Sequence, residues 1–187
     1  MEAAVRSGVT SIEHGYALDE ELRAEMVERG QYLVPTLLET TQDLDPARTS
    51  PSAYEKGVRW HRTAQESVAR SVAAGVRIAM GTDSGLAVGH GHNLKELALL
   101  VDIAGLTPME AIVAGTGDAA RLCGVDEVTG TLEAGKAADL VVTDVDPLTD
   151  IASLGEPDHV LAVVKEGRIA VDRAGLFGAG TLPALCP

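Results

Sequence analysis

Two polar side chains follow short β-branched, apolar segments and are suited to binding a metal ion. His14 comes directly after residues 9–13, and Asp83 follows residues 76–80 by way of Gly-Thr. Ligands gather at the carboxyl ends of parallel strands, so both side chains would face one mouth of a sheet. Imidazole and carboxylate groups suit a borderline cation such as zinc. Asp83 would also serve as the base that accepts a proton from a metal-bound water.

Each of these residues also has a purely structural explanation. A histidine after a strand is more often a loop residue bonded to the backbone. Asp83, within Gly-Thr-Asp-Ser-Gly, would equally suit turn and capping chemistry. His90 and His92 lie just beyond the third expected strand, where they could face the same mouth. The residue types alone therefore leave both interpretations open.

The elements that position these residues alternate between strand and helix. Apolar patterning predicts strands at 9–13, 31–37 and 76–80, and helices at 18–29, 54–74, 93–104 and 107–123. The long helix would place Trp60, Ala64 and Val68 on one face, and Thr107-Pro108-x-Glu110 is a start signal for the last helix. Between the second strand and the long helix, residues 38–53 are typical of a lid or binding loop. Strands separated by helical crossovers predict an α/β fold with a parallel sheet covered by helices.

In the last third of the chain, the alternation of strands and helices gives way to short strand patterns. Further short strands are predicted at 138–143, 160–165 and 168–172, with a tight turn at Glu166-Gly167. They indicate a small separate β unit. We therefore divide the chain into residues 1–125, residues 126–173 and a loose tail at 174–187.

Composition excludes several classes of function. The chain has 187 residues, with 28 Asp and Glu against 15 Lys and Arg, a net charge of −13 that disfavours nucleic acids and membrane surfaces. The longest apolar stretches are about six residues, too short to cross a bilayer. Cys123 and Cys186 have no metal-site or disulfide spacing, and the first residues show no secretory signal. We expect a cytoplasmic protein.

A series of motifs covers most of the chain, from about residue 2 to residue 172. In order they are 11–15 (SIEHG), 33–37 (LVPTL), 81–85 (GTDSG), 90–93 (HGHN) with 96–97 (EL), 107–112 (TPMEAI), 130–142 (GTLEAGKAADLVV) and 146–148 (DPL). Together they resemble the metal-dependent amidohydrolase superfamily, and within it the branch of Xaa-Pro dipeptidases and imidazolonepropionase-like proteins.

This resemblance implies a fold and a set of roles. The fold would be the C-terminal portion, about strands six to eight, of a TIM-like (β/α)8 barrel, followed by part of a small β-sandwich domain. His14 would bind the more exposed metal of two-metal members. Asp83 would bind the other metal and act as the catalytic base. His90, Asn93 and Tyr16 would lie near the substrate.

The family pattern is incomplete in this sequence. A His-x-His pair, a carboxylated lysine and a further histidine have no counterpart, so we expect a C-terminal part that is inactive or barely active alone. The activity implied is metal-dependent hydrolysis of the C–N bond of a small amide or dipeptide, with one or two divalent ions, zinc foremost. One alternative is a non-catalytic remnant, or a half-barrel that assembles with a complementary chain. Another is a small α/β binding module. An open sheet edge favours self-association.

Overall fold

A three-stranded parallel sheet forms the centre of the first unit. The computed structural model describes residues 1–41, 46–47, 49–85 and 90–178. The strands β1 (Ser11–Glu13), β2 (Tyr32–Val34) and β3 (Arg77–Ile78) lie in the order β1-β2-β3. Their register pairs Ile12 with Leu33 and Leu33 with Ile78. The expected parallel sheet is present, although each strand is shorter than its apolar segment.

Two helices flank β1 along the chain: α1 (Glu2–Ser7) precedes it and α2 (Glu20–Arg29) follows it. The carboxylate of Asp19 accepts a hydrogen bond from the backbone N–H of Leu22, which fixes the start of α2, and Gly30 ends it in the left-handed conformation. Arg23 of α2 is buried, where its guanidinium donates to the hydroxyls of Ser67 and Ser71. This polar contact ties α2 to the long helix that follows β2.

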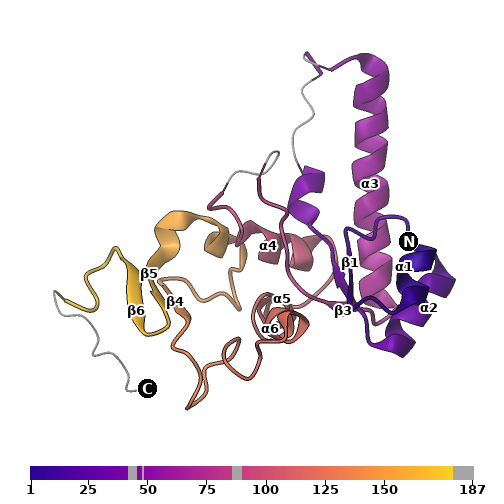
Figure 1. The fold of residues 1–187 in the computed structure, drawn as a ribbon. Coiled ribbons are helices and arrows are strands. Elements are labelled where there is room, and N and C mark those ends of the chain that lie inside the picture. The colour runs from indigo at the N-terminus through magenta and orange to yellow at the C-terminus, as the bar shows by residue number, and fades with distance from the viewer. Residues whose placement is uncertain (42–45, 48, 86–89, 179–187) are drawn as a thin grey trace.

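The long helix α3 (Pro51–Ala73) connects β2 to β3. Ala64 and Val68 in its C-terminal half are fully buried, and Val68 belongs to the same hydrophobic cluster as Ile12 and Leu33 of the sheet. Its N-terminal half extends beyond the rest of the molecule (Figure 1). The 3.6-residue pattern placed Trp60 on the same face as Ala64 and Val68, but its side chain is 45% exposed. The helix continues past the edge of the core, so periodicity alone could not predict burial at that position.

Three shorter helices complete the first unit: α4 (Lys95–Asp102), α5 (Pro108–Gly115) and α6 (Gly117–Cys123). A capping box between Thr107 and Glu110 starts α5, as the sequence predicted. The expectation of one helix over 107–123 is wrong, because the backbone breaks at Thr116. The carbonyl of Ala114 instead accepts a hydrogen bond from the N–H of Met80, and that bond anchors the end of α5 to the segment after β3.

A second, antiparallel sheet contains β4 (Leu140–Thr143), β5 (Val160–Lys165) and β6 (Arg168–Asp172) in that order. The tight turn at Glu166-Gly167 is present, and both residues have positive φ. The 3₁₀ helices η2 (Ala152–Gly155) and η3 (Pro157–His159) precede β5. Of the predicted loose tail, residues 179–187 lie outside the described residues.

The two units share one hydrophobic core. Its largest fully buried side chains include Val5, Met26, Leu33, Leu37, Val68 and Leu100. Ile151 and Leu154, beside and within η2, belong to the same cluster. An ion pair of 3.1 Å joins Lys95 of α4 to Glu156. The second unit is therefore packed against α4. Among the described residues, no helix is long and apolar enough to cross a membrane.

Candidate metal centre

Three potential metal ligands converge at the carboxyl edge of the parallel sheet. His14, Glu39 and Asp83 each offer one ligand atom, and these atoms all lie within 4.8 Å of one another. His14 and Glu39 are half-buried, and Asp83 is exposed. Imidazole nitrogen and carboxylate oxygen are both zinc ligands, and a catalytic zinc site takes three protein ligands and leaves the fourth position to water. The residues present therefore fit a divalent cation.

Several residues at this edge of the sheet have an unusual backbone conformation. Among the described residues, four that are not glycine have positive φ, and three of them are His14 (64°), Thr36 (48°) and Asp83 (51°). They follow β1, β2 and β3 respectively. A left-handed conformation costs about 1–2 kcal/mol for a residue with a Cβ, and a β-branched threonine tolerates it least. Strain repeated at three neighbouring strand ends is typical of a functional site.

The imidazole of His14 is oriented by residues around the end of β2. Its Nδ1 lies 2.8 Å from the hydroxyl of Thr36. The hydroxyl of Tyr16 lies 2.7 Å from the same Thr36 oxygen and donates to the Thr36 carbonyl at 3.1 Å. Because Nδ1 is occupied, Nε2 is the ring nitrogen left to bind a metal. Burial raises the pKa of Tyr16 to about 12, so the phenol stays neutral.

A buried carboxylate holds the segment that carries Glu39. This segment is the 3₁₀ helix η1 (Leu37–Thr41), which directly follows the end of β2. Glu96 of α4 is fully buried, and its two carboxylate oxygens accept the backbone N–H groups of Leu37 and Leu38, both at 2.7 Å. Burial raises the pKa of Glu96 to about 7, although the two hydrogen bonds oppose the rise. Thus α4 determines where η1 begins.

The sequence analysis missed the role of Glu39 because it treated residues 38–53 as one loop. A signal was available, since Glu39 is the first carboxylate after the second strand and lies a few residues past its end. Glu96 appeared only as part of a family motif. Its importance depends on burial against η1, whose residues Leu37 and Leu38 are 59 and 58 positions away along the chain.

The other predicted site residues do not belong to the ligand cluster found among the described residues. Asn93 is exposed and donates to the hydroxyl of Thr82 at 3.2 Å, which places it beside the turn that carries Asp83. His90 is exposed and follows residues 86–89, which lie outside the described residues. Tyr16 uses its hydroxyl on Thr36, so in this structure its contribution is to position the turn after β2.

Comparison with known sequences assigns this chain to a protein family whose members are consistent with its fold and its ligand cluster. Residues 1–170 match the model of the amidohydrolase family, so this chain belongs to that family, as its motifs predicted. Members of the family are generally metal-dependent, in agreement with the ligand cluster.

Individual relatives support this assignment. The chain is 33% identical over 170 residues to ochratoxinase of Aspergillus niger. The aligned region covers 89% of this chain and 35% of ochratoxinase. It is 33% identical over 112 residues to imidazolonepropionase of Geobacillus kaustophilus, covering 58% of this chain and 26% of the relative. The chain thus matches between about a quarter and a third of the length of these curated relatives.

Solved structures agree with the sequence relatives. A Xaa-Pro dipeptidase with bound methionine in its active site superposes with a TM-score of 0.77 and 31% identity, covering 90% of this chain and 41% of that one. The crystal structure of A. niger ochratoxinase gives a TM-score of 0.80 and 31% identity, covering 91% of this chain and 39% of that one. The α/β architecture of this chain is therefore similar to about two fifths of each of these larger structures.

Proposed function

We propose that this chain supplies the metal-binding strand ends of a hydrolase that cleaves the C–N bond of small amides, dipeptides included. The observation that supports this most directly is the convergence of His14, Glu39 and Asp83 within 4.8 Å. The family relationship adds hydrolysis of C–N bonds, because ochratoxinase, imidazolonepropionase and a Xaa-Pro dipeptidase are among the similar proteins.

Each residue has a role in this proposal. A bound divalent cation, zinc foremost, would polarise the scissile carbonyl and lower the pKa of water. His14 would hold the cation through Nε2, with Nδ1 fixed on Thr36. Glu39 would provide a further oxygen ligand from η1. Asp83 would bind the cation and, from its exposed position at the mouth, accept the proton of the attacking water and pass it to the leaving amine.

The remaining family features extend this proposal. We assign β1, β2 and β3 to strands six to eight of a (β/α)8 barrel, and the second sheet to part of a β-sandwich domain. His90 and Asn93 would contact the substrate from the loop after β3. The three donors found among the described residues suffice for one cation but not for the two-metal sites of larger members. We therefore expect the isolated chain to hydrolyse amides poorly or not at all.

A second candidate is a non-catalytic half-barrel that assembles with a complementary chain. Within the described part of the chain, β1 and β3 each pair only with β2, so each leaves one edge of the sheet open. Open edges favour pairing with another strand, including that of a second copy of this chain. The cytoplasmic location inferred from the cysteine pattern stays a prediction, as does the absence of nucleic-acid and membrane partners.

One set of measurements on the purified 187-residue chain separates these candidates. Isothermal titration with Zn²⁺ should show one bound ion, and His14→Ala or Asp83→Ala should weaken binding at least tenfold. His159→Ala is the matched control, because His159 bonds to Asp144 in the second unit. Failure to bind zinc would contradict the metal site. Amide turnover by the isolated chain would contradict its expected inactivity, and size-exclusion chromatography would detect assembly.

A further inference from the structure

A row of ring contacts leads from the candidate metal centre to the exposed half of α3. The His14 and Tyr16 rings are 5.6 Å apart between centroids, and those of Tyr16 and Trp60 are 5.1 Å apart in an edge-to-face arrangement of 88°. The ring of His61 lies 5.5 Å beyond Trp60. The whole chain has only five Phe, Trp and Tyr residues, so the presence of two of them beside a metal-ligating histidine is informative.

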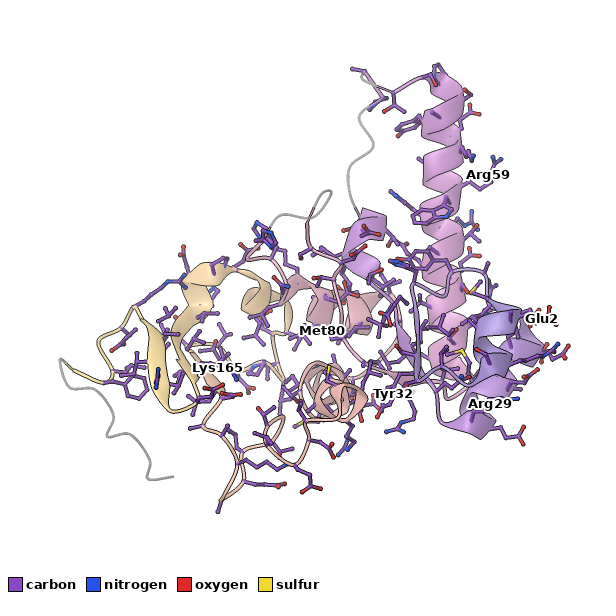
Figure 2. The ribbon with its side chains drawn as sticks, in the orientation of Figure 1. Glu2, Arg29, Tyr32, Arg59, Met80 and Lys165 are labelled. Carbon is purple, nitrogen blue, oxygen red and sulfur yellow. The ribbon has the colours of Figure 1, made fainter. Side chains whose placement is uncertain are left out.

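The position of Trp60 follows from the topology. As the crossover between two parallel strands, α3 runs antiparallel to them, so its N-terminal half rises on the side of their carboxyl ends (Figure 1). Trp60 lies in this half. The neighbouring Arg59 points away from the rest of the molecule (Figure 2). Tyr16, in contrast, contacts Trp60 from the turn after β1. The indole is therefore beside the mouth that holds the ligand cluster.

The indole is held in place but not covered. The side chain is 45% exposed although its ring packs against Tyr16. Tyr16 is itself fixed by the bonds of its hydroxyl to Thr36. A preorganised aromatic surface next to polar catalytic groups is the usual construction of a small-molecule site, in which apolar side chains line the pocket and a few polar groups fix orientation. Aromatic ligand groups gain additional stabilisation from stacked or edge-to-face contact with such a ring.

We propose that Trp60 determines substrate specificity by packing against an aromatic or large aliphatic group next to the scissile amide. This inference rests on the proposed function, because it takes the ligand cluster as the reaction centre. The substrate class is then a small amide or dipeptide with a bulky apolar side chain beside the scissile bond.

Trp60 is the only tryptophan in the chain, so its fluorescence reports directly on this surface. The zinc-loaded 187-residue chain is titrated with N-acetyl-phenylalanine amide and, separately, with N-acetyl-glycine amide. We expect a saturable change in Trp60 emission with the phenylalanine ligand and an affinity about three- to tenfold weaker for the glycine ligand. By calorimetry, Trp60→Ala should lower affinity for the phenylalanine ligand by the same factor and leave the glycine ligand unchanged.

Val58→Ala is the matched control, because Val58 is similarly exposed, at 47%, on the same helix. Equal affinities for the two ligands, or no binding of either, would overturn the inference. Trp60 emission that changes with protein concentration but not with added ligand would also overturn the inference, because a second copy of the chain would then cover Trp60. Zinc titration of the same samples tests the proposed function separately. Ligand discrimination without zinc binding would support the aromatic surface and contradict the hydrolase.

Discussion

The hydroxyl of Thr36 lies 2.8 Å from Nδ1 of His14, and this contact joins the ends of two neighbouring parallel strands. Thr36 has the left-handed φ of 48°, which a β-branched residue rarely adopts. It is also fully enclosed, with its hydroxyl and carbonyl both engaged by Tyr16 or His14. The contact therefore gives a structural reason for the strained conformation of Thr36, whose side chain contacts the candidate metal ligand His14.

Thr36→Val should weaken zinc binding about 10- to 100-fold, the usual effect of removing a group that orients a metal-ligating histidine. Thr36→Ser keeps the hydroxyl and should bind zinc nearly as the wild type does. Isothermal titration of both variants measures the difference. Equal affinity of Thr36→Val and wild type would show that the contact does not orient His14.

Glu39→Gln tests the third ligand, because an amide oxygen is a weaker and uncharged donor. We expect zinc affinity to fall about tenfold, equivalent to about 1.4 kcal/mol. Glu28→Gln removes an equal charge from an exposed position on α2 and is the control. If both variants lost affinity equally, the effect of Glu39 would be one of long-range charge only.

Glu96 predicts a dependence of stability on pH. Its folded-state pKa of about 7 lies above the ordinary value of 4.5, so the native state binds the proton more tightly than the unfolded state does. The resulting stabilisation is complete below pH 4.5 and is lost as the pH rises through 7. Relative to Glu96→Gln, the free energy of unfolding of the wild type should fall by up to about 3 kcal/mol across this window.

Urea denaturation of wild type and Glu96→Gln at pH values from 4.5 to 8 measures this difference. The variant keeps the size of the side chain and has no carboxyl to titrate, so it is the reference for the wild type at each pH. Parallel curves for the two proteins would show that the Glu96 proton is not coupled to folding.

The capping box of α5 predicts a smaller effect on stability. Thr107→Ala removes the hydroxyl that accepts the N–H of Glu110 at 3.3 Å, and should lower the free energy of unfolding by about 1 kcal/mol. Thr63→Ala, on the exposed face of α3, is the matched control and should be neutral or slightly stabilising. Chemical denaturation of both variants checks the prediction.

Local signals determined much of the fold. Strands separated by helical crossovers predicted the parallel sheet, and Thr107-Pro108-x-Glu110 predicted the start of α5. The hairpin of β5 and β6 has the bounds that its pattern indicated. These features depend on residues close together in the chain, whose spacing records strand or helix periodicity and turn chemistry directly.

Packing between distant segments determined the features of the site and fold that local patterns did not predict. Sequence spacing indicated that His14 and Asp83 would each follow a strand, and only the sheet's register and the left-handed turns brought them within reach of Glu39. The break at Thr116 and the exposure of Trp60 likewise depend on neighbours far along the chain. Periodicity specifies which face of an element is apolar, whereas burial, strain and ligand geometry arise only when that face meets its partner.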